Sequence, residues 1–356
     1  MIGTEEADAL VDGCSRALAG HGPVRAAAAL ADVPADTAVD RYGEGGVVEE
    51  LEAEVASLLG HRAAVFLPSG IMAQQAVLRV HADRRGRRTV LFHPTCHLAL
   101  HEDGALERVQ RLHGRAVGDA TRLLALDDLE AVAEPPAALM LELPQRELGG
   151  PLPDLADVDA QLAWARDLGA ATHCDGARLW EASAGYGVAP RELATRFDSV
   201  YVSFYKGLGA LAGCCLAADE ATVAEVREHR RRLGGTLYGL WPAAASALVN
   251  LRRRLPLMPR YLEHARAIAA ALTETPGVQV VPDPPQTPMM HLLLETDGGS
   301  VEAAARRIAA ERGVWTVRGA GPTADPRFVR VELPVGDATL ALAPDEAAAL
   351  IGELAR

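Results

Sequence analysis

The chain has 356 residues, which is enough for one large α/β domain with an appendage or for two domains. Hydrophobic residues make up 49% of the sequence and charged residues 23%, which excludes disordered, collagen-like and coiled-coil proteins. The formal net charge of -13 repels phosphate backbones and anionic lipid headgroups, so the expected partner is a small molecule rather than nucleic acid or a membrane.

The first part of the chain predicts an arm followed by a large α/β domain. Residues 1–40 are rich in alanine and follow a helical pattern that Pro23 and Pro34 interrupt, so they predict an N-terminal helical arm. From residue 41 to residue 252, short β-prone runs alternate with helical stretches, which is typical of βαβ units and a mostly parallel sheet covered on both faces. The runs predicted as strands are 63–67, 89–92, 138–143, 171–174, 199–204 and 213–216.

The pattern changes at Pro256 and Pro259, which mark the start of a second domain. Helices are predicted over residues 261–272 and 301–311. The runs predicted as strands around them are 278–281, 291–295, 315–317 and 328–333. This order of elements predicts a small C-terminal α+β domain over residues 253–356.

The sequence also predicts a cytoplasmic location. No apolar run reaches the roughly 18 residues that a membrane span needs, and the start of the chain lacks the basic and then apolar layout of a secretory signal. The five cysteines are odd in number and scattered, which favours reduced thiols over a disulfide framework.

Lys206 is the only lysine among 35 basic residues. A drift toward GC-rich codons exchanges lysine for arginine wherever a fixed positive charge suffices, because either cation can form a surface salt bridge. That exchange fails where an amine must lose its proton, since a guanidinium stays charged and cannot form an imine. Lys206 follows a predicted strand and opens a glycine-rich turn, where ligands bind in open α/β sheets. It is therefore a candidate nucleophile, with a structural lysine in a loop as the alternative.

Two further patterns follow predicted strands. Asp175 directly follows the run 171–174, and a carboxylate there could pair with a protonated pyridine nitrogen, as pyridoxal phosphate (PLP) requires when it acts as an electron sink. On its own, an Asp-Gly pair is equally typical of a turn. Ser69 and Gly70 lie between a strand and a helix, where backbone N–H groups bind a phosphate or where the serine simply caps the helix.

These residues stand in the order seen in fold-type-I PLP enzymes, and the chain resembles the L-threonine aldolase/β-eliminating lyase family in particular. The resemblance covers roughly residues 40–240 and continues weakly to Arg330. It rests on Tyr42-Gly43-Glu44, Pro68-Ser69-Gly70, Cys96-His97, His101-Glu102-Asp103-Gly104-Ala105, Asp175-Gly176-Ala177-Arg178, Ser203 with Lys206-Gly207-Leu208-Gly209-Ala210, and Gly234-Gly235. The fold implied is aspartate aminotransferase-like, with a large domain around a mostly parallel sheet and a small α+β domain.

The resemblance implies how the cofactor is held. Lys206 would carry PLP as a Schiff base, Asp175 would hold the pyridinium nitrogen, and His97 would stack on the ring. His97, or a water that it orders, would also be the base. The residues implied to contact the cofactor are Ser69, Gly70, Ile71, His97, Asp175, Arg178, Ser203 and Lys206.

The resemblance also implies a substrate site and an assembly. Arg178 and Arg330 would receive the substrate carboxylate, a role that suits the planar guanidinium. A homodimer or homotetramer with active sites at a subunit interface is implied, in which the basic residues 230–232 reach a neighbouring site.

The chain departs from the family pattern at several positions. The Ser-Asp-Thr element near the start is missing, Ile71 replaces the phosphate-loop threonine, and Tyr238 replaces an arginine after the glycine pair. Gln145 stands where typical aldolases carry a histidine, and it can hydrogen-bond a substrate hydroxyl but cannot act as a base.

The expected function is retro-aldol cleavage of a β-hydroxy-α-amino acid to glycine and an aldehyde. The loss of a base at Gln145 keeps open PLP-dependent β-elimination or racemisation, and a non-catalytic binding module on the same fold is a third hypothesis. His93, Cys96, His97 and His101 admit a metal site, but Pro94 places His93 outside a helix, so no metal is expected.

Overall fold

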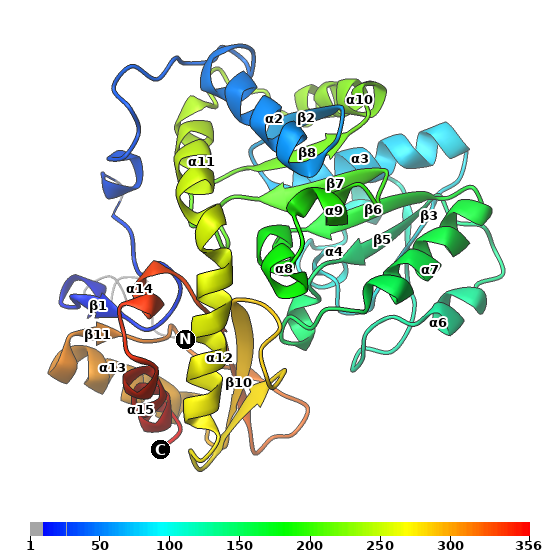
Figure 1. The fold of residues 1–356 in the computed structure, drawn as a ribbon. Coiled ribbons are helices and arrows are strands. Elements are labelled where there is room, and N and C mark those ends of the chain that lie inside the picture. Colours follow the sequence, from blue (N-terminus) through cyan, green and yellow to red (C-terminus); the bar gives the residue numbers. More distant parts are fainter. Residues whose placement is uncertain (1–9, 26) are drawn as a thin grey trace. The chain divides into compact units, whose positions relative to one another are not determined.

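The computed structural model describes residues 10–25 and 27–356 and divides the chain into two compact units (Figure 1). The larger unit contains residues 27–148 and 152–256. The smaller unit contains residues 149–151 and 257–356, together with the described part of the first 26 residues. The domain boundaries expected after residues 40 and 252 stay predictions. No helix in the described ranges is long and apolar enough to cross a membrane.

The larger unit is built on a seven-stranded sheet with the strand order β2-β8-β7-β6-β5-β3-β4. The neighbours from β7 to β4 pair in parallel, whereas β8 runs antiparallel to both β7 and β2. The strands are β2 (Ala63–Leu67), β3 (Thr89–Phe92), β4 (His113–Ala116), β5 (Ala138–Glu142), β6 (Ala171–Gly176), β7 (Ser199–Ser203) and β8 (Cys214–Ala218). The sequence predicts all of them except β4, whose residues His-Gly-Arg-Ala offer no apolar run.

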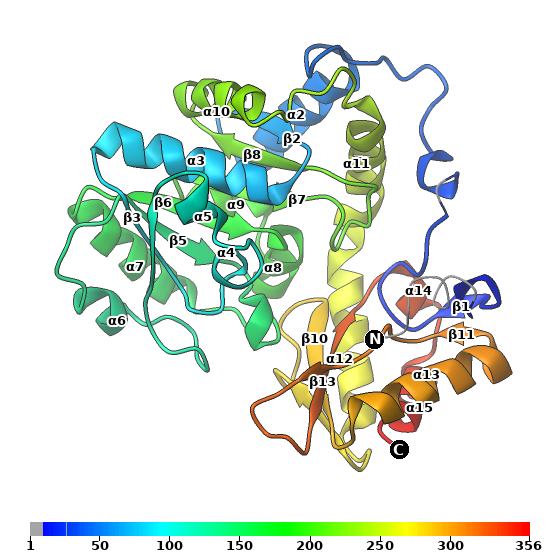
Figure 2. The ribbon, with the colours of Figure 1, turned by 180° about the vertical axis from the view of Figure 1, so that it is seen from behind.

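Helices cover both faces of this sheet. The strands β6, β7 and β8 are buried along their whole length, as expected for strands covered on both faces; β8 is a continuous apolar run, whereas β6 and β7 also carry buried polar side chains. Figures 1 and 2 show α2, α7 and α9 on one face and α3 and α10 on the other. The helices are α2 (Gly46–Leu59), α3 (Gly70–Arg85), α4 (His97–Leu100), α5 (Ala105–Arg108), α6 (Leu126–Glu130), α7 (Leu155–Asp167), α8 (Leu179–Tyr186), α9 (Pro190–Ala194), α10 (Glu220–Arg232) and α11 (Trp241–Arg254), with 3-10 turns at Ala28–Leu30 and Arg146–Leu148.

The parallel strands bring polar residues to one edge of the sheet. Glu142 ends β5, and in the β5–β6 register it lies directly beside Asp175 of β6. Ser203 ends the next strand, β7, and Lys206 follows three residues later. Because ligands of open α/β sheets bind at the carboxyl ends of the strands, this edge is where a site is expected.

The smaller unit is an α+β layer, as the sequence predicts. Its antiparallel sheet has the strand order β12-β13-β10-β9, and a separate parallel pair joins β1 to β11. The strands are β1 (Arg16–Ala17), β9 (Val278–Val281), β10 (Met289–Leu294), β11 (Val314–Trp315), β12 (Gly321–Pro322) and β13 (Val329–Pro334). The helices are α12 (Met258–Leu272), α13 (Gly298–Arg312), α14 (Asp337–Leu340) and α15 (Pro344–Leu354). A 3-10 turn at Leu255–Leu257 spans the boundary between residues 256 and 257.

The helical arm predicted over residues 1–40 is wrong for most of its described part. Helix occurs there only at residues 10–12 and as the 3-10 turn at residues 28–30, whereas residues 16–17 form a strand. Gly20 and Gly22 have positive φ angles, and the prolines at 23 and 34 follow, so the alanine-rich composition does not produce a continuous helix. Residues 1–9 and 26, which belong to the same prediction, lie outside the described residues.

Candidate active site

Asp175 is the buried carboxylate of the site, with 1% of its surface exposed. Its Oδ1 accepts a hydrogen bond from the Ala177 backbone N–H at 3.1 Å, and its Oδ2 accepts one from Gln74 Nε2 at 2.6 Å. An ionised carboxylate has about four acceptor positions, so these two donors leave capacity for a further donor. The sequence predicts Asp175 but not Gln74, because Gln74 lies on α3 and reaches Asp175 only when α3 packs against β6.

Lys206 lies in the turn after β7, half-buried in a group of charges. Burial lowers the pKa of the Lys206 amine; the Asp175 carboxylate opposes this lowering, and the Arg178 guanidinium adds to it. The Lys206 Nζ atom also lies 5.9 Å from the centre of the Tyr205 ring. A lysine amine whose pKa is lowered is a better nucleophile toward a carbonyl group at neutral pH.

Ser69, Gly70 and Ile71 form the turn from β2 into α3. Ser69 caps the helix, because its Oγ accepts a hydrogen bond from Met72 N at 3.3 Å. The first N–H groups of a helix lack partners within it, and the dipole of a 16-residue helix favours an anion at this end. The backbone of Gly70 and Ile71 can therefore bind a phosphate even though Ile71 has no hydroxyl group.

Gly70 packs tightly against β7, and an added side chain is expected to be costly. A Cβ atom at this position would lie 2.2 Å from Tyr201 Oη, and Tyr201 is buried. We expect Gly70→Ala to lower the free energy of unfolding by roughly 1–3 kcal/mol, the usual cost of overpacking, and to weaken PLP binding. Chemical denaturation and PLP titration measure the two effects.

Gly298→Ala is the matched control for this prediction. Gly298 is likewise the first residue of a long helix, α13, but no atom lies within 4 Å of the position of an added Cβ. The control is expected to keep the stability of the parent protein. Equal effects of the two substitutions would show that the Tyr201 contact is not the cause.

Ser203 joins the end of β7 to the loop after Asp175. Its buried hydroxyl donates a hydrogen bond to the Ala177 carbonyl at 2.8 Å, and Trp180 Nε1 donates one to the Ser203 carbonyl at 3.2 Å. The hydroxyl hydrogen is thus used within the protein, and a bond to phosphate would require it to leave the Ala177 carbonyl. The role of Ser203 in cofactor binding stays a prediction.

His97 begins α4 and is held by a carboxylate that sequence reasoning did not assign to it. His97 Nδ1 lies 3.2 Å from Glu102 Oε1, and Gln75 Nε2 donates to Glu102 Oε2 at 3.3 Å. Because the carboxylate accepts the Nδ1 proton, neutral His97 keeps an unprotonated Nε2 that can accept a proton. The signal in the sequence is that Glu102 follows His97 by five residues. The burial of Glu102 is seen only in the structure.

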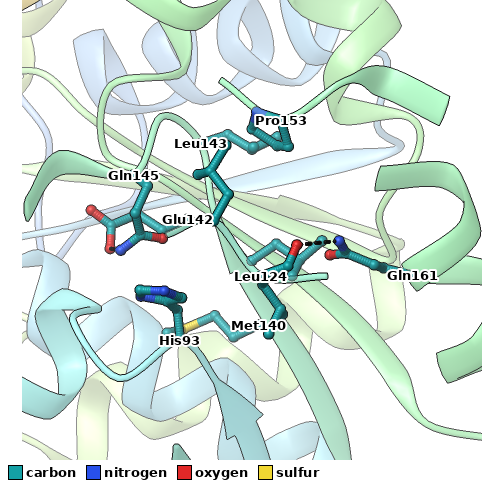
Figure 3. A pocket seen from close by; sticks show the side chains of 10 residues that line it. His93, Leu124, Met140, Glu142, Leu143, Gln145, Pro153 and Gln161 are labelled. Atoms are coloured by element: carbon teal, nitrogen blue, oxygen red, sulfur yellow. Dashed lines mark hydrogen bonds between the residues drawn. The ribbon is translucent and has the colours of Figure 1, made fainter. Parts of the chain in front are cut away.

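Gln145 is buried beside Glu142. Its Nε2 lies 3.2 Å from both Glu142 Oε2 and Thr95 Oγ1. Both residues line a small, mainly apolar pocket, in which Figure 3 shows the Gln145 amide beside the Glu142 carboxyl group with the His93 ring below them. The other lining residues are Leu123, Leu124, Met140, Leu141, Leu143, Pro153 and Gln161.

Glu142 is expected to make the protein less stable as the pH rises. Burial and the neighbouring Asp175 carboxylate raise the pKa of Glu142 to about 8. The unfolded carboxyl group titrates near about 4.3, so the folded state binds the proton more tightly and loses stability as the pH rises from there through about 8. Glu142→Gln removes this loss, so its melting temperature relative to the parent should rise by several degrees between pH 6 and pH 9. Calorimetry at the two pH values measures the difference.

Glu130→Gln is the control for this pH dependence, because Glu130 is an exposed carboxyl group in the same unit. It should follow the parent at both pH values. A Glu142→Gln protein that also follows the parent would contradict the assignment of the raised pKa.

Arg178 and Arg330 lie in different units of the chain. Arg178 precedes α8 in the larger unit and is close enough to Lys206 for its charge to affect the amine. Arg330 lies on β13 of the smaller unit, opposite Leu293 of β10. Their roles as receivers of a substrate carboxylate stay predictions.

His93, one of the residues considered for a metal site, has protein partners on its ring. His93 Nε2 lies 2.8 Å from the Arg122 carbonyl oxygen and 3.0 Å from that of Asp119, and the Thr95 backbone N–H donates to His93 Nδ1. Both ring nitrogens of His93 thus have protein partners. Within the described part of the chain, no group of three or more histidine, cysteine or acidic side chains could hold a metal ion.

Comparison with known proteins adds to this geometry. A family model of β-eliminating lyases matches residues 22–295. Low-specificity L-threonine aldolase 1 of Arabidopsis thaliana is 28% identical over 290 residues, which cover 79% of this chain and 81% of that protein. A solved structure of a candidate L-allo-threonine aldolase from Listeria monocytogenes EGD-E is 35% identical and superposes with a TM-score of 0.90, over 98% of this chain and 99% of that one.

A more distant solved structure shares the fold alone. Serine palmitoyltransferase from S. paucimobilis, in a structure with bound PLP, is 17% identical and superposes with a TM-score of 0.66, over 99% of this chain and 83% of that chain. The fold seen here is thus also the fold of a PLP-binding protein.

Proposed function

The chain belongs to the β-eliminating lyase family, and from that membership we propose that it is a PLP-dependent lyase that cleaves a β-hydroxy-α-amino acid into glycine and an aldehyde. The observation that carries the proposal is the pairing of charges at the sheet edge. The only lysine of the chain lies there under the influence of the buried carboxylate of Asp175.

The residues present fit PLP. Asp175 is an acceptor with free capacity, as a protonated pyridine nitrogen needs. The α3 N-terminus offers backbone N–H groups for the phosphate, in a turn where a Cβ at Gly70 would collide with Tyr201. Lys206 is an amine in partly buried surroundings, which suits attachment of an aldehyde. Bound PLP supplies an electron sink for the electron pair released when a bond to Cα breaks.

The protein side chains would handle the protons and the substrate charges. In retro-aldol cleavage the β-hydroxyl group loses its proton, the Cα–Cβ bond breaks, the hydroxyl-bearing carbon leaves as an aldehyde, and Cα gains a proton to give glycine. His97 Nε2 would take that proton, with Glu102 holding the opposite side of the ring. Gln145 would orient the hydroxyl group by a hydrogen bond, and Arg178 would bind the substrate carboxylate.

Gln145 favours one second candidate function. Its amide is buried and donates to Glu142 and Thr95, and an amide cannot take a proton from a substrate hydroxyl. PLP-dependent β-elimination or racemisation does not require a base at that position. These reactions would use the same Lys206, Asp175 and phosphate-binding turn.

We further propose that the protein is a cytoplasmic homo-oligomer. The rings of Tyr42 and Tyr238 pack edge to face at 5.4 Å and are nevertheless 56% and 67% exposed. Ile71, in the turn from β2 into α3, is 38% exposed. Exposed aromatic side chains of this kind are typical of subunit contacts. The five free cysteines support a reducing compartment. Light scattering during gel filtration measures the oligomeric state.

A substrate screen of the purified, PLP-loaded protein tests the proposed function. L-Threonine, L-allo-threonine and other β-hydroxy amino acids are offered, and glycine, aldehyde, keto acid and ammonia are quantified. Equal amounts of glycine and aldehyde support the aldolase. Keto acid with ammonia supports the eliminase instead, and epimerised substrate supports a racemase. A protein that neither binds PLP nor turns over any substrate would be a non-catalytic module.

A further inference from the structure

A line of buried hydrogen bonds runs from the interior of the larger unit to Asp175. His81 Nε2 lies 2.8 Å from Ser199 Oγ, which lies 2.9 Å from His173 Nδ1. His173 Nε2 lies 3.0 Å from Gln74 Oε1, and Gln74 Nε2 donates to Asp175 Oδ2 at 2.6 Å. All five side chains are buried. They come from α3, β6 and β7.

The chemistry of the groups fixes the direction of every bond in this line. An ionised Asp175 only accepts, so Gln74 presents its NH₂ group to it and its carbonyl oxygen to His173. His173 therefore carries its proton on Nε2. Burial lowers the pKa of His173 to about 3, so this ring is neutral. Its Nδ1 lies 2.9 Å from Ser199 Oγ and 3.2 Å from the Ser199 carbonyl oxygen; with the proton on Nε2, the closer contact is one in which Nδ1 accepts the Ser199 hydroxyl hydrogen.

The same reasoning extends to the far end of the line. With its hydrogen given to His173, Ser199 Oγ accepts from His81 Nε2. Burial, with smaller contributions from Arg85 and Arg84, lowers the pKa of His81 to about 3, so this ring is also neutral and its Nδ1 carries no proton. That Nδ1 is buried with no hydrogen-bond partner. The line thus begins at His81 Nδ1, an acceptor that receives no hydrogen bond. From there each group donates its hydrogen to the next group on the way to Asp175.

Bonds that all point one way polarise each other and strengthen the last bond of the series. We propose that His81, Ser199, His173 and Gln74 are positioning residues that hold the Asp175 carboxylate in the orientation in which its remaining acceptor positions meet the cationic ring nitrogen of the cofactor. None of the four needs to touch the cofactor or the substrate. The cofactor part of this inference rests on the proposed function.

Nuclear magnetic resonance of the histidine rings tests the direction of the line without any substitution. Protein labelled with ¹⁵N at the imidazole nitrogens should show His81 and His173 as neutral rings with the proton on Nε2. A proton on Nδ1 of either ring, or a charged ring at pH 7, would overturn the inference.

Two substitutions test the effect on the cofactor. Gln74→Met keeps the volume of the side chain but removes both hydrogen bonds, and Ser199→Ala breaks the line two bonds away from Asp175. We expect the dissociation constant of PLP to rise about tenfold or more for Gln74→Met and less for Ser199→Ala, since losing a hydrogen bond to a charged group has effects of this size. The visible absorption maximum of the bound cofactor should shift in the same direction in both.

Ser183→Ala is the matched control. Ser183 is also a buried serine of the larger unit, but its hydroxyl donates only to the Trp180 carbonyl, at 3.3 Å. Its PLP affinity and absorption should equal those of the parent. If Gln74→Met and Ser199→Ala lower the melting temperature yet bind PLP with unchanged affinity and spectrum, the line is purely structural and the inference is wrong. A parent protein that binds no PLP would instead contradict the proposed function.

Discussion

Replacing Lys206 by alanine is expected to lower kcat/KM for aldehyde release by at least about 10⁴-fold, because the amine that attaches the cofactor is lost. Lys206→Arg should fail to a similar extent, since a guanidinium keeps the positive charge but cannot attack an aldehyde. Borohydride treatment of the PLP-loaded parent should fix the cofactor on one peptide, because Lys206 is the only lysine. Mass spectrometry identifies that peptide.

The arginine variant separates chemistry from charge in this experiment. If Lys206 only balanced the charge of the Asp175 carboxylate, Lys206→Arg would keep most of the activity and the alanine variant alone would lose it. Cofactor found on the terminal amine, or activity retained by Lys206→Arg, would contradict the assignment of the nucleophile.

Asp175→Asn is expected to give the second largest loss, about 10²–10⁴-fold in kcat. The substitution keeps the shape of the side chain but removes the negative charge that a protonated pyridine ring requires to act as an electron sink. A charge-assisted hydrogen bond also becomes a neutral one, so we expect PLP to bind at least about tenfold more weakly. Steady-state kinetics and PLP titration measure the two effects.

Asp198→Asn is the matched control, because it makes the same chemical change at the other end of the same strands. The Asp198 carboxylate accepts hydrogen bonds from the backbone N–H and the hydroxyl of Thr172, the second residue of β6. Asp198→Asn should change the free energy of unfolding but leave the affinity for PLP unchanged. A kcat of Asp175→Asn close to that of the parent would show that another group serves the ring nitrogen.

The parts of the site that sequence reasoning finds are those encoded by local pattern. Asp175 lies near the end of one buried strand and Lys206 follows the next, and the carboxyl ends of parallel strands share one edge, so their meeting can be predicted from spacing alone. Ser69 and Gly70 are predicted in the same way, because a helix start is a local feature.

The parts that it misses depend on register and packing between distant segments. Glu142 lies beside Asp175 only because β5 and β6 pair in one particular register, and a shift of one residue would move it to the other face. Gln74 and His173 look like ordinary polar residues of a helix and a strand until α3 packs on the sheet. The polar strand β4 is missed for a related reason, since its position beside β3 and not its composition makes it a strand.

Because β2 lies at the edge of the sheet, it must wait for its pairing partner while the chain is being synthesised. β8 is the only strand that pairs with β2 in the seven-stranded sheet of the described residues, and Cys214 of β8 follows Leu67 of β2 by 147 residues. At the usual rate of about 5–20 residues per second, a ribosome needs roughly 7–30 s to make that stretch. A nascent chain therefore carries β2 as an unpaired apolar strand during this time, and the turn from β2 into α3 gains its packing partners late in translation.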